Sequence, residues 1–479
     1  MSTSLITVEL DANLSVVQTL RRFQDCAFCL LLDSSAEVRE QDARYSILTA
    51  DPVDTLRLET VEHGDDPFEA LRHWRGRLPT AVDSPSFCGG IAGLMSYELG
   101  HAFEQLPSPD RDDFQTPALL AGLFDWAIVW DHLEPSVKLC VIMLDTADSH
   151  ASESRQQARI QWVLDRLNGK PAESCSNFQT HVERSSPLLP EGYRLPIEPN
   201  VFSCFSREDY MTAVERVIEY IRAGDIFQAN IAQQMTASWT GTAVDLYQHV
   251  REQNPAPFCG LLQADDFAVV SASPERFLKV TDDRFVETRP IKGTRRRHRS
   301  PIADLYTSNE LSASEKDRAE DVMIVDLLRN DLSRVCSPGS VKVTGVCEIE
   351  IFETVQHLVS TIVGELQPDK DIFDLCAAAI PGGSITGAPK IRAMQIIAEL
   401  EPVARGVYCG NLFYLGPNGD FDSSILIRTF TLKNQIVQFP VGGGIVADSL
   451  PADEYEETLH KAAGMLSALR GKSTHHTGS

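Results

Sequence analysis

The chain of 479 residues lacks the features that mark membrane, fibrous and disordered proteins. No uncharged stretch reaches the roughly 18–20 apolar residues that a membrane span needs. The N-terminus has neither a basic start nor an apolar core of signal-peptide length. With 43 % hydrophobic and 23 % charged residues, the composition is that of an ordinary globular protein. We therefore expect a cytoplasmic protein that does not bind membranes.

Basic residues and cysteines are also scarce. The 43 Lys and Arg residues face 68 Asp and Glu residues, which leaves a formal net charge of −25. So acidic a surface repels nucleic-acid phosphates, and we expect no nucleic-acid partner. Eleven scattered cysteines are typical of reduced thiols in a cytosolic protein. Cys26-x-x-Cys29 has no second pair, so zinc is not expected.

The length suits two or three packed regions rather than one domain. Residues 1–168 mix short strand-like runs with helical segments. Residues 169–200 contain five prolines and several serines, which favours a linker or surface excursion. A second region spans 201–471, and the tail 472–479 is expected to be disordered.

The second region predicts antiparallel sheets covered by helices, an α+β architecture. Apolar residues at helical spacing predict a helix over 207–223. Four short strand-like runs separated by Asp-containing turns then predict a β-meander. These runs are Phe258–Gln263, Phe267–Ala272, Arg276–Val280 and Arg284–Thr288.

A basic segment at 289–299 stands out in this acidic chain, with six Lys or Arg residues and no acid. A solvated basic loop is the simplest interpretation. Lys292, however, follows a strand and precedes Gly293, which lets backbone approach a ligand closely. A lysine held in that way could act as a nucleophile.

Three acidic segments are candidates for catalysis or metal binding. Glu275 follows Ser-Pro at a break between two strands and could act as a general acid/base, or pair with a surface arginine. Asp317 and Glu320 share one face of a helix that Ser314 would cap, and Glu454 and Glu457 share a face of a later helix. Hard carboxylate oxygens on one face suit Mg²⁺, although surface acids near a helix start are the simpler interpretation of either pair.

Two glycine-rich segments are suited to binding an anion. Pro381-Gly-Gly-Ser-Ile-Thr-Gly-Ala-Pro-Lys390 leads into a helix N-terminus, where free N–H groups favour a phosphate or carboxylate. It lacks the spacing of a P-loop. Gly442, Gly443 and Gly444 follow the strand expected at 436–441, and their backbone N–H groups could face a carboxylate.

Together these segments resemble the chorismate-utilising enzymes. Five motifs match in order and spacing, and Gly93–Gly100 is similar to the family's first region. The motifs are Ser273-Pro-Glu-Arg-Phe, Pro290-Ile-Lys-Gly-Thr, Met323-Ile-Val-Asp-Leu-Leu-Arg-Asn-Asp, Pro381-Gly-Gly-Ser-Ile-Thr-Gly-Ala-Pro-Lys and Gly442-Gly-Gly-Ile-Val-Ala-Asp-Ser. The resemblance implies two facing antiparallel β-sheets with helices outside.

The resemblance also implies a site for Mg²⁺ and chorismate. The metal ligands would be Glu320 and Glu457, with Asp317 and Glu454 in the outer shell. Lys292 and Glu275 would be catalytic. The positions that would contact substrate are Gly293, Thr294, His357, Thr386, Tyr408, Arg428, Gly442, Gly443 and Gly444.

Lys292 indicates the aminodeoxychorismate branch of this family, because anthranilate synthases typically carry alanine at that position. The resemblance implies that Lys292 attacks ring C2 while Glu275 assists departure of the C4 hydroxyl, and that ammonia then adds at C4. The product would be 4-amino-4-deoxychorismate, a precursor of 4-aminobenzoate and folate. Alternatives are an anthranilate synthase of tryptophan synthesis, an isochorismate-type enzyme that uses water, and a non-catalytic paralogue.

The resemblance implies two further features. The chain lacks the Gly-x-Cys-x-Gly nucleophile elbow of a glutamine amidotransferase, so a separate subunit of that kind is expected to supply ammonia. Ser34, Pro255, Ala256 and Pro257 match positions that line a tryptophan pocket in the family. An ordinary apolar core between the sheets is an equal interpretation of these four residues.

Overall fold

A computed structural model of the chain describes residues 4–35, 44–80, 87–145, 149–169, 189–297, 300–351 and 355–470. The expected tail, most of the expected linker and two residues near the end of the basic segment lie outside these ranges. None of the described helices combines the length and the hydropathy that crossing a membrane requires.

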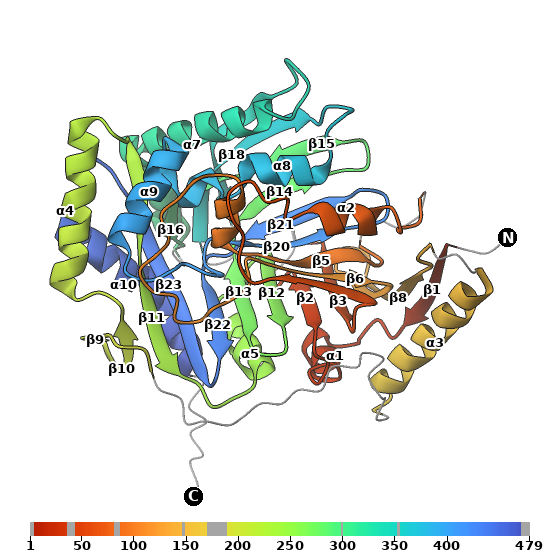
Figure 1. Cartoon of the computed structure of the whole chain (residues 1–479). Coiled ribbons are helices and arrows are strands. Elements are labelled where there is room, and N and C mark those ends of the chain that lie inside the picture. Colours follow the sequence, from red (N-terminus) through yellow and green to blue (C-terminus); the bar gives the residue numbers. More distant parts are fainter. Residues whose placement is uncertain are drawn as a thin grey trace, which may run out of the picture.

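Two antiparallel sheets form the framework (Figure 1). Within the described residues, the first sheet has 13 strands and the second has 10. In spatial order the first sheet contains β1 (Leu5–Leu10), β8 (Ser136–Ile142), β7 (Trp126–Asp131), β3 (Tyr45–Ala50), β2 (Cys29–Asp33), β12 (Phe258–Gln263), β13 (Ala268–Ser273), β22 (Thr429–Lys433), β23 (Ile436–Ile445), β11 (Gln228–Ser238), β10 (Glu198–Ser203) and β9 (Tyr193–Leu195), with β19 (Gly387–Ala388) paired to β11.

The second sheet also draws on both halves of the chain. It contains β16 (Ile291–Arg296), β18 (Val355–Glu365), β15 (Phe285–Thr288), β14 (Arg276–Val280), β21 (Phe421–Ile425), β20 (Asn411–Leu415), β5 (Gly90–Met95), β6 (Leu119–Phe124) and β4 (Asp54–Leu58), with β17 (Lys342–Ile351) paired to β18. Strands of residues 1–168 therefore pair with strands of residues 201–471 in both sheets, and the last residues of the expected linker form β9 and the start of β10.

Helices cover the outer surfaces of the sheets (Figure 1). They are α1 (Val16–Arg21), α2 (Glu69–Arg75), α3 (Ser149–Leu167), α4 (Arg207–Ala223), α5 (Ala243–Gln253), α6 (Pro301–Ala313), α7 (Glu315–Ser333), α8 (Ile372–Ala379), α9 (Lys390–Leu400) and α10 (Pro451–Arg470), with the 3₁₀ turns η2 (Tyr97–Ala102) and η3 (Gly383–Ile385). Helices α4, α5, α9 and α10 pack on the first sheet, whereas α6 and α7 pack on the second.

The bounds of α4 are those that the apolar spacing predicts. Ser206 caps its start, where the Ser206 hydroxyl accepts a hydrogen bond from the Asp209 N–H at 3.0 Å. Gly224 ends it with φ of 84°, a conformation that glycine adopts without strain. Its buried face, which includes Val214 and Val217, packs beneath the first sheet.

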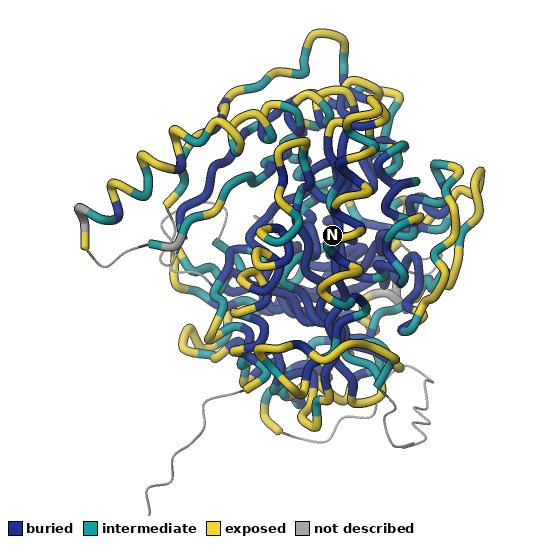
Figure 2. Tube along the Cα trace, turned by 90° about the vertical axis from the view of Figure 1, so that its left-hand side faces the viewer, coloured by how far each residue is buried: buried dark blue, intermediate teal, exposed yellow. Residues whose placement is uncertain are grey.

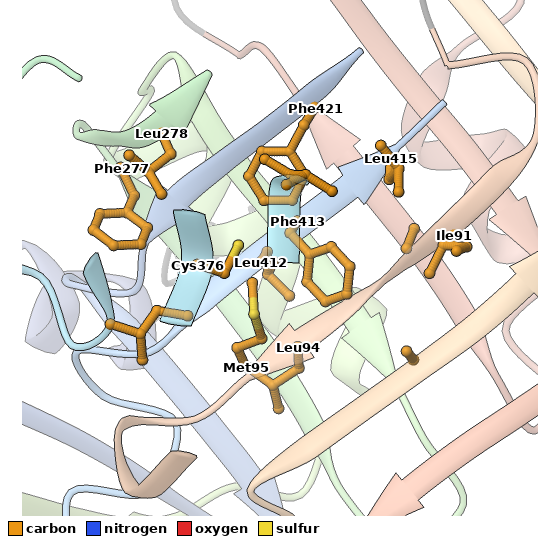
Figure 3. Close-up of a cluster of buried hydrophobic side chains, with 14 of the residues drawn as sticks. Ile91, Leu94, Met95, Phe277, Leu278, Cys376, Leu412, Phe413, Leu415 and Phe421 are labelled. Carbon is orange, nitrogen blue, oxygen red and sulfur yellow. The ribbon is translucent and has the colours of Figure 1, made fainter. Parts of the chain in front are cut away.

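Two large apolar cores hold the layers together, and buried residues fill the middle of the molecule (Figure 2). One core lies between the first sheet and its helices. The other joins the two sheets and helices α2, α7 and α8. In Figure 3, side chains of β5, β14, β20, β21 and α8 meet in this second core, where Phe413 and Phe421 stack with ring centroids 6.0 Å apart. At about 25 cal/mol per Å² of apolar surface, such burial is the main favourable contribution to folding.

The expected β-meander is wrong in one respect. β12 pairs with β13 in the first sheet, but β14 pairs with β15 in the second. The chain crosses between the sheets at Pro274-Glu275, where proline ends the strand pairing. This crossing places Glu275 between the two sheets, which a meander would not do.

Candidate active site

Glu275 and Lys292 meet at Ser384. The Ser384 hydroxyl donates to Glu275 Oε1 at 2.7 Å, and Lys292 Nζ donates to the Ser384 carbonyl at 3.0 Å. Glu275 comes from the crossing between the sheets, Lys292 from β16, and Ser384 from η3. Three segments distant in sequence therefore place an acid and an amine at one serine.

The backbone of Glu275 is held on both sides. The Ile425 N–H donates to the Glu275 carbonyl at 3.0 Å, and the Glu275 N–H donates to the Ser273 hydroxyl at 3.2 Å. Burial raises the pKa of the Glu275 carboxyl to about 7, although Ser384 and Lys292 oppose the shift. A carboxyl with that pKa exchanges a proton readily near neutral pH, as a general acid/base must.

Lys292 and its neighbour Gly293 lie in an irregular part of the second sheet. Lys292 pairs with Leu358 of β18, and the register shifts between Lys292 and Thr294. Gly293 has φ of 64°, and a Cβ there would approach Leu311 to 2.7 Å. The position therefore requires glycine. Any other residue would be strained at this positive φ, and its side chain would clash with Leu311 in the wall of the site.

Next to Lys292, Thr294 and His357 form a pair. Thr294 Oγ1 and His357 Nδ1 are 2.9 Å apart. Burial, reinforced by the nearby Arg428 guanidinium, lowers the pKa of His357 to about 3. His357 is therefore a neutral imidazole at physiological pH, suited to contacting a ring or a hydroxyl rather than to binding an anion by charge.

Arg428 is the cation that faces the site. It precedes β22, and β22 pairs with β23 only between Ile436 and Gln438. On this side, Gly442–Gly444 of β23 therefore have no strand partner among the described residues, although Lys461 Nζ donates to the Gly442 carbonyl at 2.9 Å. The guanidinium makes no hydrogen bond or ion pair with any residue that the structure describes, and burial lowers its pKa. A half-buried arginine without an acid, beside a strand edge that lacks a strand partner, is suited to binding a carboxylate.

Gly442, Gly443 and Gly444 lie inside β23 rather than after it, since this strand continues to Ile445. All three pair with β11. A Cβ on Gly443 would lie 3.2 Å from Glu454 Oε2 and 3.7 Å from Glu457 Oε1, and one on Gly444 would lie 3.5 Å from Glu320 Oε2. The structure thus brings the three expected acids to the glycine strand from α7 and α10.

Lysines balance these acids. Lys316 Nζ lies 3.5 Å from Glu454 Oε1, and Lys461 Nζ lies 2.7 Å from Glu457 Oε1. Burial disfavours the charge of Lys316, but Glu454, Glu320 and Glu457 together hold its pKa above the usual value. The three glutamates thus create a field that favours a cation at this place.

The donor set fits Mg²⁺. Glu320 and Glu457 supply hard carboxylate oxygens, whereas the described residues contain no group of three or more His, Cys, Asp or Glu side chains arranged to hold a metal. Mg²⁺ commonly binds one or two protein carboxylates and completes its shell with substrate oxygens and water. Asp317 instead pairs with Arg295 at 3.1 Å, beside Gly293.

Thr386 and Tyr408 are buried against the same loop. Thr386 Oγ1 donates to the Gly382 carbonyl at 2.9 Å, and its own carbonyl accepts from the Asn230 N–H at 2.7 Å. Tyr408 follows Arg405, whose guanidinium lies 5.8 Å from the Tyr408 ring centroid. Both residues therefore lie in the wall of the site next to η3.

Sequence reasoning missed Ser384, Lys461 and Arg405 as site residues. Arg405 forms a buried ion pair with Glu401 at 2.7 Å and donates to the Ile385 carbonyl at 2.9 Å. It thereby fixes the glycine-rich loop. Ser384 lies inside a motif that the sequence singled out, whereas nothing in the sequence around Lys461 or Arg405 points to the site.

Acids neutralise much of the basic segment. Arg289 pairs with Glu350, and Arg297 Nη2 lies 2.8 Å from Asp304 Oδ2. Together with the pair between Arg295 and Asp317, these contacts give three arginines of the segment internal partners. The segment is therefore built into the wall around Lys292.

A separate cavity of about 320 Å³ lies between the sheets. Ser34 and Pro257 line it, but Pro255 and Ala256 are not among its lining residues. Ser34 Oγ donates to the Pro257 carbonyl at 3.2 Å. The neighbouring Asp33 accepts from Arg251 Nε at 2.7 Å. That tryptophan occupies this cavity stays a prediction.

Comparison with known proteins agrees with this architecture. The profile of the chorismate binding enzyme family matches residues 28–467. The chain belongs to this family. This chorismate binding enzyme is 38 % identical over 444 residues to aminodeoxychorismate synthase component 1 of Escherichia coli, covering 89 % of the chain and 90 % of that protein. It is 37 % identical over 436 residues to anthranilate synthase component 1 of Pseudomonas aeruginosa, covering 90 % and 84 %.

A solved relative confirms the fold of this chorismate binding enzyme. The crystal structure of anthranilate synthase component I from Streptococcus pneumoniae superposes with a TM-score of 0.73 at 30 % identity, covering 89 % of this chain and 93 % of that chain. The expected α+β fold of two facing antiparallel sheets is therefore confirmed. The roles of the individual site residues stay predictions.

The raised pKa of Glu275 predicts a pH-dependent contribution to stability. Between about pH 4.5 and the folded pKa of about 7, the folded chain keeps a proton that the unfolded chain has lost. This contribution is fully present below about pH 4.5 and is lost as the pH rises through 7. Relative to Glu275→Gln, the wild type should lose about 2 to 3 kcal/mol of unfolding free energy between about pH 5 and pH 8.

Urea unfolding of both proteins at the two pH values measures this difference. Glu215→Gln, on the exposed face of α4, is the control for losing one carboxylate. If the difference in unfolding free energy between the wild type and Glu275→Gln does not change with pH, the raised pKa is contradicted.

Proposed function

We propose that this chorismate binding enzyme aminates chorismate at C4, releasing water and forming 4-amino-4-deoxychorismate. The observation that carries the proposal is the contact of Lys292 and Glu275 with opposite ends of Ser384. A nucleophilic amine and an exchangeable carboxyl proton at one place are what substitution through a lysine-linked intermediate needs. The similarity to aminodeoxychorismate synthase component 1 of several bacteria supports the same reaction.

The reaction proceeds in two substitutions. The Lys292 amine adds its electron pair to C2, both conjugated ring double bonds shift by one bond toward C4, and the C4 hydroxyl leaves as water with a proton from Glu275. Ammonia then adds at C4, both double bonds shift back, and the lysine amine leaves C2. Glu275 takes the surplus proton from the new amine, so both residues return to their starting states.

The substrate is a dianion, and this acidic protein holds it with local cations and N–H groups. Arg428 binds one carboxylate, and the open edge of β23 at Gly442–Gly444 offers backbone N–H groups to it. The neutral His357 contacts the ring without attracting a second anion. Thr386 and Tyr408 complete the wall beside the ring.

Mg²⁺ would be held by Glu320 and Glu457, with Glu454 and Asp317 further out. When bound, it neutralises the second carboxylate of the substrate and withdraws electron density from the ring. The protein's own part is to hold these carboxylates close together. Although burial opposes the shift, Lys461 lowers the pKa of Glu457, whereas burial raises the pKa of Glu320.

Ammonia requires a source outside this chain. The relatives are each named as component 1 of their enzyme, which supports an enzyme of two components. We propose a glutamine amidotransferase as the second subunit. Such a subunit would release ammonia next to the site. Free ammonium at high concentration should then replace it.

Anthranilate synthesis is the second candidate function, because anthranilate synthases are almost as similar to the chain. That reaction aminates C2 and releases pyruvate. A lysine that occupies C2 blocks it, so Lys292 favours amination at C4. In the proposed role, the product supplies 4-aminobenzoate and folate synthesis through a separate lyase.

The identity of the product tests the proposed function directly. The purified chain is incubated with chorismate, Mg²⁺ and concentrated ammonium, and the product is identified by mass spectrometry. We expect an amino compound that retains the enolpyruvyl group and yields 4-aminobenzoate when a lyase is added. Anthranilate with released pyruvate would instead establish the second candidate.

Replacing Lys292 tests the covalent step. Lys292→Ala should abolish C4 amination, because no amine remains to occupy C2. Lys292→Arg keeps the cation but not the nucleophile, so it should be equally inactive. With chorismate and no ammonia, the intact wild-type chain should gain the mass of chorismate less one water, and neither variant should. Normal C4 product from either variant would refute the lysine-linked route.

Replacing Glu320 tests the cation site. Glu320→Gln removes one of two carboxylate ligands and should weaken Mg²⁺ binding by at least about tenfold, measured by calorimetric titration. Glu315→Gln, an exposed position in the first turn of the same helix, is the matched control. Equal Mg²⁺ affinity of the wild type and Glu320→Gln would remove Glu320 from the site.

A further inference from the structure

Two carboxamides of β11, those of Gln228 and Asn230, make no side-chain hydrogen bond with any described residue. Gln228 is only 1 % exposed, and the oxygens Gln228 Oε1 and Asn230 Oδ1 are buried without a partner. Gln233 on the same strand is different, because it accepts from Ser203 Oγ at 2.6 Å and donates to Thr458 Oγ1 at 2.5 Å. Buried polar groups are nearly always paired, so the two exceptions require an explanation.

Strand alternation determines where these side chains point. Ala229 and Ile231 pack into the core beneath the helices, whereas Ala232 belongs to the core that joins the two sheets. Gln228 and Asn230 alternate with Ala229 and Ile231, so they lie on the face turned toward the second sheet. That is the side from which Lys292 and Glu275 approach.

The two amides lie against the glycine strand. A Cβ on Gly444 would come within 2.0 Å of Gln228 Nε2, and one on Gly442 would come within 2.7 Å of Asn230 Oδ1. A Cβ on Gly444 would also lie 3.5 Å from Glu320 Oε2. These glycines therefore leave the space that the amides need, and Gln228 borders the proposed cation site.

The strand that carries the amides is rigidly held. Arg405 Nη2 donates to the Asn230 carbonyl at 2.7 Å, and Glu401 Oε1 accepts from the Ala232 N–H at 2.8 Å. The Asn230 N–H is bonded to the Thr386 carbonyl. A polar group on so fixed a backbone is preorganised for a ligand, because little freedom remains to be lost on binding.

We propose that Gln228, together with Asn230, hydrogen-bonds the anionic ring acid that binds between the glycine strand and Lys292. The inference rests on the proposed function and adds two substrate contacts to it. Each carboxamide can present N–H groups to a carboxylate or its oxygen to a hydroxyl or amine. Being neutral, both contact a dianion without adding to the negative charge of the neighbouring glutamates.

Matched substitutions on one strand test this assignment. Gln228→Met and Gln233→Met remove the same amide at two buried positions of β11. Chorismate affinity is measured by calorimetry with Mg²⁺ and without ammonia, and stability by thermal unfolding. Gln228→Met should weaken chorismate binding about tenfold or more without lowering the unfolding midpoint, because its amide has no partner in the free chain. Gln233→Met should lower the midpoint and leave chorismate affinity unchanged.

Gln228→Glu provides a second variant that keeps the shape of the side chain. Its charge should repel the dianion and weaken chorismate binding more than Gln228→Met does. Affinity for Mg²⁺ alone, measured separately, should not fall in Gln228→Met. A fall in Mg²⁺ affinity there would overturn the inference in favour of a role in holding the cation.

The remaining outcomes separate this inference from the proposed function. Equal chorismate affinity of the wild type and Gln228→Met would overturn the inference alone. A Gln228→Met variant with a lowered midpoint and normal chorismate affinity would assign Gln228 to the core and overturn it as well. A wild type that does not bind chorismate would refute the proposed function, and the inference with it.

Discussion

The proposed site depends on one constraint, which is that a carboxyl group must be buried between two sheets and still exchange a proton near neutral pH. Glu275 meets it because Pro274 ends one strand and the chain crosses to the other sheet at that point. Burial raises the pKa of Glu275, while Ser384 and Lys292 keep the carboxyl hydrogen-bonded and close to a cation. Hydrogen bonds hold the Glu275 backbone on both sides, and an apolar core joins the two sheets around it.

Charge is distributed unevenly, in a way that suits an anionic ligand. The chain has a net charge of −25, yet it places Lys292 and Arg428 on the inner side of the sheets without a salt bridge to any described acid. Three arginines of the basic segment, Arg289, Arg295 and Arg297, are paired with Glu350, Asp317 and Asp304 instead. The described part of the chain thus places unpaired positive charge where a dianion would bind and neutralises these three arginines.

Much of the local structure follows from the sequence. The helix over 207–223 has the predicted bounds because its apolar spacing, cap and terminal glycine all agree. The short strands near 258–288 each begin within one residue of the predicted position, and Phe258–Gln263 and Arg276–Val280 are predicted to the residue. Their assignment to one meander fails, because short-range turn signals do not tell which sheet a strand joins.

The sequence by itself determined the chemistry available: an amine at Lys292, a carboxyl at Glu275, acids at Glu320 and Glu457, and glycines that leave backbone accessible. The motifs also identified the family. Only the tertiary structure decided which of these groups meet, since Ser384 is 109 positions from Glu275 and 92 from Lys292 in the chain. Contacts of such separation depend on sheet pairing and packing, which a local pattern does not encode. For the same reason Lys461, Arg405 and the unpaired amides of Gln228 and Asn230 became visible only in the folded chain.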